Sequence, residues 1–426
     1  MKLNYKRTFL VGLAFLSISA FWQLYDGIIP LILKNTFAIG DTLAGGVMAL
    51  DNILALFMLP LFGTLSDRVS TPIGRRMPFI LLGTALTVIF MLLIPISDNA
   101  ANFPMFMTSL IITLVSVSLY RSPAVALMPD VTPRALRSKA NAIINLMGAV
   151  GTVFTLVMIT LLVPDTDKPN YLPLFGIVAG IMVTAVGILF FTINEKKLAA
   201  EVQAVDEEPK YMDEQSENQE QGMPRPVRRS LLLVLLSVFL WFMAYNGATT
   251  HFSKYAQTVL GMSGGKYATI LLVATVVAVI SYIPVGIFAA RLGRKKTILL
   301  GISLMFIAFA IGSCFSSYHP LLSVLFGLVG MGWAAINVNS YPMVVEMAKG
   351  SDIGRFTGYY YTFSMSGQVI TPIISGALLE HVSYRTLFPY SAVLMLLAFC
   401  AMSMVKHGDH RPELPKDKLE MLDIGD

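Results

Sequence analysis

About twelve stretches of this chain are apolar over close to twenty residues, the length that a helix needs to cross the hydrocarbon core of a membrane. Only 13% of its 426 residues are charged, against about a quarter in soluble domains. The sequence therefore predicts an all-α integral membrane protein with twelve transmembrane helices. The expected spans are 9–33, 41–65, 78–96, 106–128, 139–163, 173–193, 231–251, 266–290, 297–316, 321–345, 356–378 and 387–405.

One loop pattern occurs twice, about 220 residues apart, and each copy lies between two apolar segments. In the first copy, at 63–76, Gly-x-x-x-Asp-Arg precedes Gly-Arg-Arg. In the second copy, at 286–296, Gly-x-x-x-Ala-Arg precedes Gly-Arg-Lys-Lys. Duplicated membrane units are typical of transporters built from two similar halves. We therefore expect two six-helix bundles.

The only long polar interruption separates these halves and is rich in Glu, Asp and Gln, a composition typical of disordered segments. We expect an N-terminal bundle at 1–193, a disordered cytoplasmic linker at 194–229, a C-terminal bundle at 230–405 and a solvated tail at 406–426. The basic residues of the short loops fall on one side together with both termini. Because such loops face the cytoplasm, both termini are expected there, in a multi-pass protein of the cell membrane.

Several classes of function are not indicated by the sequence. The net charge of +5 is explained by cytoplasmic loops, so no nucleic-acid partner is expected. Cys314 and Cys400 lie inside apolar segments without a CxxC arrangement, and no metal site is expected. We find no P-loop, HExxH or GxSxG motif, so neither an enzyme nor a cofactor is predicted. Transport, if active, would draw on an ion gradient.

Three ionisable residues lie inside predicted spans, where they are costly and usually functional. Asp26 lies in the first span, with Gln23 on the same helix face. Asp51, followed by Asn52, lies about ten residues into the second span, about 15 Å along the helix and near the midplane. Arg121, in the fourth span, is suited to contact a carboxylate or sugar hydroxyls. The alternative is a carboxylate snorkelling to water near the outer end of the helix for Asp26, a structural polar contact between helices for Asp51, and snorkelling to the cytoplasmic surface for Arg121.

Neutral amides and aromatic rings occur in several spans. Amides bond hydroxyl groups and flat rings stack on apolar faces, which is the chemistry of a sugar site. Any one of these side chains is more often a helix-packing contact than a ligand contact, but the set favours a neutral polar substrate. The candidates for substrate binding are Gln23, Tyr25, Asn52, Tyr120, Asn145, Tyr245, Asn246, Trp333, Asn337, Tyr361 and Gln368.

The first loop copy resembles the motif between the second and third helices of the major facilitator superfamily. That resemblance implies that the Asp67 carboxylate faces the positive end of a helix from the other half, holding the halves together in one state. The second copy has Ala290 at this position and is expected to lack the contact. The residues expected to act in gating are Gly63, Asp67, Arg68, Arg75, Arg76, Arg137 and Glu346, the last paired with a basic residue such as Arg355.

The resemblance extends to a subgroup of this superfamily. It rests on the runs 120–130 and 137–148 and on the Pro-Phe-Ile sequence at 78–80. They are similar to the sucrose/proton symporters of plants and animals, within the glycoside–pentoside–hexuronide cation symporters. The plant group carries an arginine two residues after Pro123, where this chain has Val125. Arg121 lies one turn earlier on about the same face.

The resemblance implies proton-coupled symport of a disaccharide or glycoside by alternating access. Asp26 or Asp51 would carry the proton and Arg121 would balance its charge. The expected partners are the sugar, H⁺ with Na⁺ as the alternative, and membrane lipid, and the protein is expected to be a monomer. Two other functions stay open: an exporter of drugs or metabolites with the same fold, and a membrane sensor or enzyme.

Overall fold

The computed structural model describes residues 3–133, 136–166, 168–206, 224–347 and 353–409. Within these ranges, twelve helices are long and apolar enough to cross a membrane. Each expected span overlaps one of them, which confirms the predicted all-helical architecture. Bulky apolar side chains such as Leu161 and Phe191, 70% and 86% exposed, cover the outer surface, as a lipid-facing surface requires.

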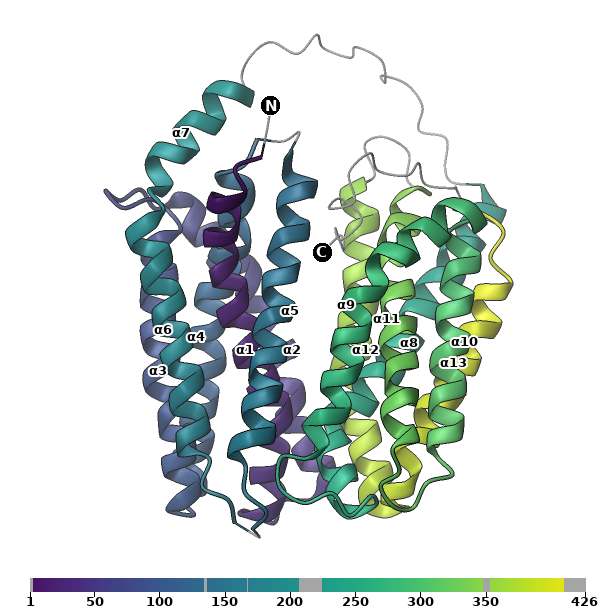
Figure 1. Cartoon of the computed structure of the whole chain (residues 1–426). Helices are drawn as coiled ribbons and strands as arrows, with labels where there is room; N and C mark the ends of the chain where they lie inside the picture. Colours follow the sequence, from purple (N-terminus) through teal and green to yellow (C-terminus); the bar gives the residue numbers. More distant parts are fainter. Residues whose placement is uncertain (1–2, 134–135, 167, 207–223, 348–352, 410–426) are drawn as a thin grey trace.

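The helices form two bundles of six, which stand side by side in Figure 1. The first contains α1 (Tyr5–Asn35), α2 (Asp41–Arg68), α3 (Met77–Asn99), α4 (Phe103–Asp130), α5 (Arg137–Leu162) and α6 (Leu172–Thr192). The second contains α8 (Arg225–Thr258), α9 (Tyr267–Leu292), α10 (Arg294–Gly312), α11 (Leu321–Val345), α12 (Ile353–His381) and α13 (Leu387–Ser403), with a short 3₁₀ turn at Tyr384–Thr386. We call these bundles the N half and the C half.

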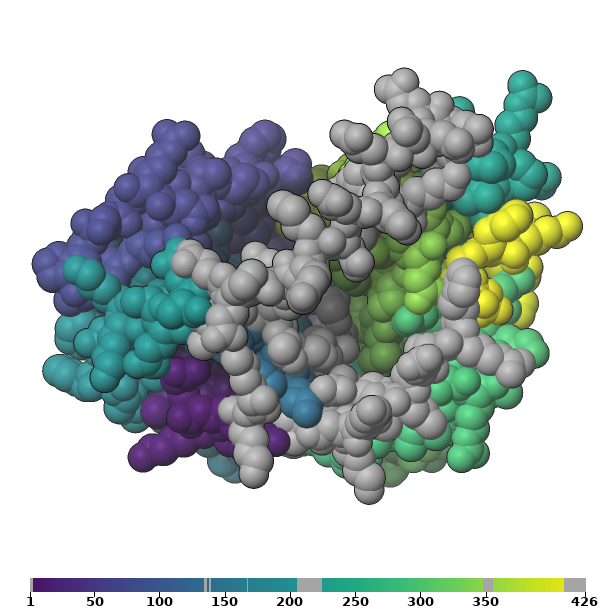
Figure 2. Space-filling model, turned by 90° about the horizontal axis from the view of Figure 1, so that it is seen from above, coloured from purple at the N-terminus to yellow at the C-terminus, as the bar shows by residue number. Residues whose placement is uncertain are grey.

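The twelve-residue helix α7 (Glu195–Asp206) lies at the end of the molecule where α1 begins and α13 ends (Figure 1). We call this end the α7 side and the other end the opposite side. Figure 2 looks onto the α7 side, with the N half at the left and the C half at the right. That the α7 side is cytoplasmic stays a prediction from the loop charges.

The polar interruption differs from its prediction as a disordered linker. Residues 195–206 are helical, and α8 begins at Arg225, before the predicted boundary; residues 207–223 lie outside the described ranges. The segment is rich in Ala, Glu and Lys, which favour helix. It also places Leu198 and Val202 against the bundle. This apolar face stabilises the helix, although the composition of the whole interruption is typical of a disordered segment.

The tail also begins in contact with the C half rather than in solvent. The His407 ring lies 2.9 Å from the Ser230 hydroxyl, and Asp409 accepts a hydrogen bond of 3.0 Å from the Lys295 amide. Asp409 thereby covers the N-terminus of α10, where a carboxylate is favoured. The rest of the predicted tail, from residue 410, lies outside the described ranges.

The two halves meet closely at the opposite side through glycines. A Cβ at Gly45 of α2 would lie 2.0 Å from the Pro372 carbonyl oxygen of α12, and one at Gly265 would lie 2.0 Å from the Ile159 carbonyl oxygen. Small residues permit such backbone contact between membrane helices. The halves therefore touch at one end and leave room between them toward the other.

Candidate functional site

A cavity of about 1020 Å³ lies between the halves. Its lining runs from Thr250 and Pro372, beside the contacts of the opposite side, to Pro129 in the last turn of α4 on the α7 side. Helices of both halves form its walls, including α1, α2, α4 and α5 from the N half and α8, α9, α11 and α12 from the C half. This conformation is closed at the opposite side, and its cavity extends toward the α7 side.

All the charged side chains among the described residues of the lining come from the N half, and they are Asp26, Asp51 and Arg121. Asp26 is exposed to the cavity and forms no hydrogen bond or ion pair with the described part of the chain. Asp51 accepts a hydrogen bond of 2.8 Å from Asn52 and lies within electrostatic reach of Arg121 and Asp26. The Arg121 guanidinium lies 5.7 Å from the Trp22 ring centroid. Asp26 is thus the carboxylate left open to a ligand or a proton.

The C half supplies a neutral, aromatic wall. The rings of Tyr245 and Trp333 stack with centroids 3.8 Å apart and an interplanar angle of 7°. Phe242 meets the Trp333 ring edge-on at 5.3 Å. Asn246, Asn337 and Gln368 add amide groups to the same wall. The cavity is therefore divided between a charged N-half wall and a neutral C-half wall.

The cavity brings together all but two of the residues expected for coupling and substrate binding. Their roles stay predictions. The residues that line it are Gln23, Asp26, Asp51, Asn52, Arg121, Asn145, Tyr245, Asn246, Trp333, Asn337, Tyr361 and Gln368.

Tyr25 and Tyr120 do not line the cavity, contrary to the expectation for them. Both are buried between helices of the N half, 2% and 0% exposed. The Tyr25 hydroxyl donates to the Val47 carbonyl at 3.3 Å, and the Tyr120 hydroxyl lies 3.0 Å from that of Ser17. Each tyrosine immediately precedes a charged cavity residue, so the helical rotation of about 100° per residue turns it into the bundle.

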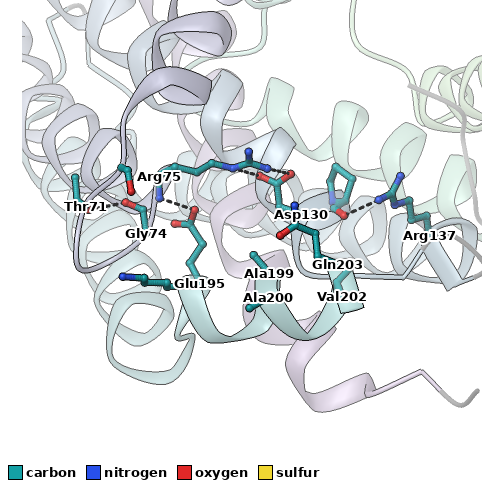
Figure 3. A pocket seen from close by; sticks show the side chains of 13 residues that line it. Thr71, Gly74, Arg75, Asp130, Arg137, Glu195, Ala199, Ala200, Val202 and Gln203 are labelled. Carbon is teal, nitrogen blue, oxygen red and sulfur yellow. Dashed lines mark hydrogen bonds and ion pairs between the residues drawn. The ribbon is translucent and has the colours of Figure 1, made fainter. Parts of the chain in front are cut away.

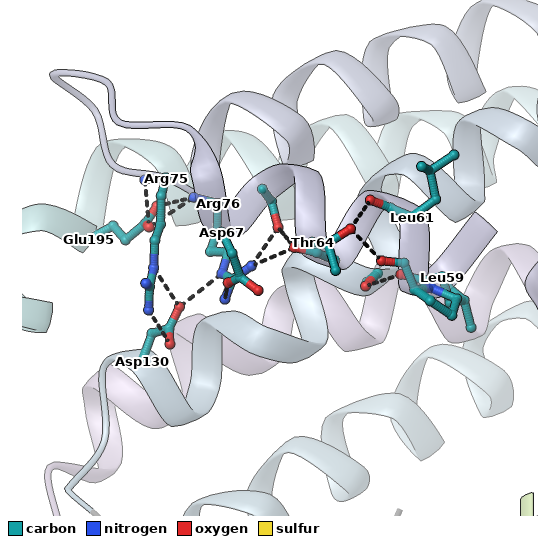
Figure 4. Close-up of polar contacts among 12 residues, drawn as sticks. Leu59, Leu61, Thr64, Asp67, Arg75, Arg76, Asp130 and Glu195 are labelled. Atoms are coloured by element: carbon teal, nitrogen blue, oxygen red, sulfur yellow. Dashed lines mark hydrogen bonds and ion pairs between the residues drawn. The ribbon is translucent and has the colours of Figure 1, made fainter. Parts of the chain in front are cut away.

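On the α7 side, Arg76 is the centre of a charge network (Figure 4). Its guanidinium forms ion pairs with Asp67 and, at 2.9 Å, with Asp130, and lies 3.4 Å from the Gly63 carbonyl oxygen. Arg75 binds Asp130 as well, at 2.7 Å. These residues come from the ends of α2 and α4 and from the loop at 69–76, so the first loop motif binds within its own half.

The expected contact of Asp67 with the other half is therefore not the one seen in this conformation, and it stays a prediction for the alternate state. The second loop copy has Ala290 in place of the carboxylate, and its lack of a contact with the other half stays a prediction. Arg294 of this copy forms a 2.7 Å ion pair with Glu346. Arg355, the basic partner expected for Glu346, donates to the Tyr359 hydroxyl at 2.8 Å.

Two other predicted gating residues lie near the same network. Arg137, at the start of α5, donates to the carbonyl oxygens of Pro129 and Thr132 at 3.0 and 3.2 Å. It thereby ties the end of α4 to α5. Arg68 is exposed at the end of α2.

Sequence reasoning missed Glu195, which anchors this loop. Its carboxylate, 2% exposed, accepts hydrogen bonds from the backbone amides of Arg75, Arg76 and Met77 at 2.8 to 3.1 Å. Figure 3 shows the bond from Arg75. The negative charge of Glu195 therefore lies at the N-terminus of α3, where the helix dipole stabilises a carboxylate. Gly74 has φ +117°, and a Cβ there would lie 2.2 Å from Glu195, so the turn requires glycine. An acidic residue directly after the sixth apolar segment is the signal in the sequence.

Replacing Glu195 with alanine is expected to destabilise the N half. The change leaves three backbone amides at the N-terminal end of α3 without this partner, and unpaired buried groups cost about 1–3 kcal/mol. Thermal unfolding of the purified protein should shift to lower temperature, and α7 should become more sensitive to protease. Glu201→Ala is the control, because Glu201 is 53% exposed and only 3.9 Å from Arg7. Equal stability of the two variants would contradict the anchoring role.

Twelve spans in two bundles around a polar cavity define a multi-pass membrane transporter. Residues 11–283 and 266–421 match the Major Facilitator Superfamily, and the chain belongs to this family. It is a family of transporters rather than enzymes. The match reaches the superfamily and does not identify the sucrose/proton symporter subgroup.

Curated relatives match shorter stretches of the chain. The MFS-type transporter ppzB of Metarhizium rileyi is 28% identical over 123 residues, which is 29% of this chain and 25% of the relative. The MFS antiporter QDR3 of Candida albicans is 25% identical over 118 residues, which is 28% of this chain and 16% of that protein. The matched stretch thus spans about a quarter or less of these relatives.

Solved transporters share the fold over nearly the whole chain. A mutant of the nucleoside transporter NupG superposes with a TM-score of 0.70 at 13% identity, covering 94% of this chain and all of that one. The POT family transporter PepTSo superposes with a TM-score of 0.68 at 12% identity, covering 95% and 98%. At these identities the likeness concerns the fold alone.

Proposed function

We propose that the protein is a proton-coupled symporter of a sugar, a disaccharide or glycoside, that works by alternating access. The observation that carries the proposal is Asp26, a carboxylate at membrane depth that is open to the cavity and has no protein partner in the described chain. Such a group is costly while charged and unpaired. Binding a proton neutralises it, so the free energy of proton binding is linked to the state of the cavity.

The other two charges are arranged to compensate each other. Asp51 has Asn52 and Arg121 as its neighbours, whereas no amide or guanidinium of the described residues is bonded to Asp26. With one proton on Asp26, the formal charge of the three groups is zero. A neutral site of this kind fits a neutral substrate. This balance supports Asp26 as the proton carrier and Asp51 with Arg121 as the fixed pair.

The C-half wall supports a sugar as that neutral substrate. Its amides are suited to bond hydroxyl groups, and the stacked rings of Tyr245 and Trp333 offer a flat surface to the apolar face of a pyranose. The resemblance of the loops at 63–80 and 120–148 to sucrose/proton symporters points in the same direction. The proposal therefore assigns proton binding to the N half and substrate contact mainly to the C half.

Trp333→Ala is expected to weaken sugar binding without uncoupling transport. Loss of an aromatic contact worth about 0.5–1.5 kcal/mol raises KM roughly threefold to tenfold. The ratio of protons to sugar should stay that of the unmodified protein, because no titratable group is removed. KM and proton uptake are measured together in proteoliposomes, with Phe191→Ala on the outer surface as the control. A changed proton ratio with unaltered KM would refute this division of roles.

Uptake into proteoliposomes tests the proposed function directly. A panel of labelled mono- and disaccharides is offered with an inward proton gradient, with an inward Na⁺ gradient and with neither. We expect one sugar to accumulate only with the proton gradient and to leave when a protonophore is added. Uptake that only equilibrates the sugar across the membrane would indicate a facilitator. Accumulation driven by the Na⁺ gradient would show that Na⁺, and not H⁺, is the coupling ion.

Export of drugs or other metabolites is the second candidate function. Two observations favour it: the similarity to a protein named as an antiporter, and an open carboxylate that faces aromatic rings and is suited to an organic cation. In an exporter, cation and proton would compete for Asp26. Loss of the protein would then sensitise cells to lipophilic cations, and these cations would release protons from the purified protein. Sugars would do neither.

A further inference from the structure

Buried charged groups from both halves close the opposite side of the cavity. The Lys254 ammonium of α8 lies 2.8 Å from a carboxylate oxygen of Asp41 of α2. Lys254 is 0% exposed and Asp41 is 6% exposed. The hydroxyl of Tyr384, at the start of the 3₁₀ turn, donates to the second oxygen of the same carboxylate. One N-half carboxylate is therefore shared by two groups of the C half.

Further contacts between the halves surround this cluster. The amide of Thr42 donates to Glu380 of α12 at 2.8 Å. The Lys34 ammonium at the end of α1 donates to Thr258 of α8 at 2.6 Å and lies 4.2 Å from the Tyr384 ring centroid. Two lysines, two carboxylates and a tyrosine thus join α1 and α2 to the C half at one place.

The cluster is distinct from the coupling residues. Asp41 and Asp51 lie ten residues apart on α2, about 15 Å along the helix axis. Between the cluster and the cavity lies His251, which is fully buried and has its Nε2 3.1 Å from the Pro372 carbonyl oxygen. Pro372 itself lines the cavity. The cluster therefore lies beyond the end of the cavity, between it and the opposite side.

We propose that Asp41, Lys254 and Tyr384 form the latch that holds the opposite side closed, and that their separation opens the cavity to that side. The inference rests on the proposed alternating access but on no particular substrate. Its physical basis is the buried position of the pair: removal of one partner leaves an uncompensated charge in a low-dielectric site. Opening brings that charge into water, so neutralising either partner alone favours the open state.

Distances between spin labels on the two halves test the latch in the full chain without substrate. Cys314 and Cys400 are first replaced by serine, and labels are attached through Ala100→Cys and Ser317→Cys, both exposed at the opposite side. Asp41→Asn and Lys254→Met are each expected to raise the ratio of long to short distances by about tenfold or more. Tyr384→Phe, which keeps the ion pair, should produce a smaller rise.

The double variant Asp41→Asn with Lys254→Met separates a pair interaction from general damage. The double variant leaves no lone charge. Its ratio of long to short distances should therefore be closer to that of the unmodified protein than the ratio of either single variant, as expected for a coupled pair. A second label pair is placed on the α7 side through Lys197→Cys and Lys296→Cys. The distance between these two labels should shorten when the distance between the labels on the opposite side lengthens. A longer distance on the opposite side without a shorter distance on the α7 side indicates local unfolding and would overturn the proposal.

Asp165 provides the matched control at the same end of the molecule. It lies 3.4 Å from Lys266 of the other half, but the two side chains are 58% and 65% exposed, and exposed pairs contribute little. A hydrogen bond from Ser263 holds the pKa of Asp165 below its usual range, so Asp165 is charged at neutral pH. Asp165→Asn should leave the distances unchanged. If Asp41→Asn and Lys254→Met behave like it, the latch is refuted, whatever the substrate proves to be.

Discussion

Sugar accumulation is expected to disappear when Asp26 and Asp51 are both replaced by asparagine. At zero membrane potential, a gradient of two pH units supports about 100-fold accumulation with one proton per sugar, since each unit is worth about 1.36 kcal/mol. The double variant keeps the shape and polarity of the cavity but has no carboxylate there to carry the proton. It should therefore equilibrate sugar across the membrane without concentrating it. Uptake of the labelled sugar into proteoliposomes measures this difference.

The single variants distinguish the two carboxylates. Asp26→Asn alone should abolish accumulation, because Asp26 is open to the cavity and is bonded to no residue in the described ranges. Asp51→Asn removes the neighbour of Arg121 and should weaken transport while leaving part of the coupling. Asp165→Asn, at the surface, serves as the control and should accumulate sugar normally. If the double variant still concentrates sugar, the proton-coupled proposal for these residues must be abandoned.

Gly45→Ala is expected to open the cavity to the opposite side. A Cβ at this position would lie 2.0 Å from the Pro372 carbonyl oxygen, closer than any real contact. A backbone oxygen inside a packed helix moves only with its helix, so α2 and α12 must separate. A cysteine introduced at Thr250, 8% exposed in the cavity wall, should react at least about tenfold faster with an impermeant maleimide added from that side, a shift of about 1.4 kcal/mol in the equilibrium.

The neighbouring glycine provides a closely matched comparison. A Cβ at Gly46 would meet no atom of the described residues within 4 Å, so Gly46→Ala makes the same substitution at the next position without a clash. Its labelling rate should equal that of the cysteine variant alone. Gly376→Ala, where the added Cβ would lie 2.2 Å from the Asp41 carbonyl oxygen, should reproduce the effect from the other helix. Equal rates in all three variants would show that this helix crossing does not control access.

The sequence predicted the fold well because membrane spans depend on local properties. About twenty consecutive apolar residues identify a span without knowledge of its neighbours. The expected span at 321–345 agrees with α11, Leu321–Val345. The least accurate C-terminal boundary was that of α8, which continues to Thr258 beyond the expected end at 251. Polar residues such as His251, Ser253 and Lys254 favour the end of an apolar span, yet all three are buried between helices.

The candidate site was predicted in part, for the same reason. Ionisable groups within apolar spans, such as Asp26, Asp51 and Arg121, are conspicuous in any membrane sequence, and the structure brings them to one cavity. The direction of a neutral side chain is less evident. Tyr25 and Tyr120 have side chains suited to a substrate site, but their positions around the helix axis place them in the interior of the bundle.

By itself, the sequence determined that this is a helical membrane protein of two similar halves, and which polar residues lie at membrane depth. Only the tertiary structure decided which distant residues meet. Lys254 and Asp41 are 213 positions apart, and Glu195 binds amides about 120 positions before it. Hydropathy and helical periodicity are local properties, whereas the pairing of buried charges depends on how the two bundles pack against each other, and that packing has no local signature in the chain.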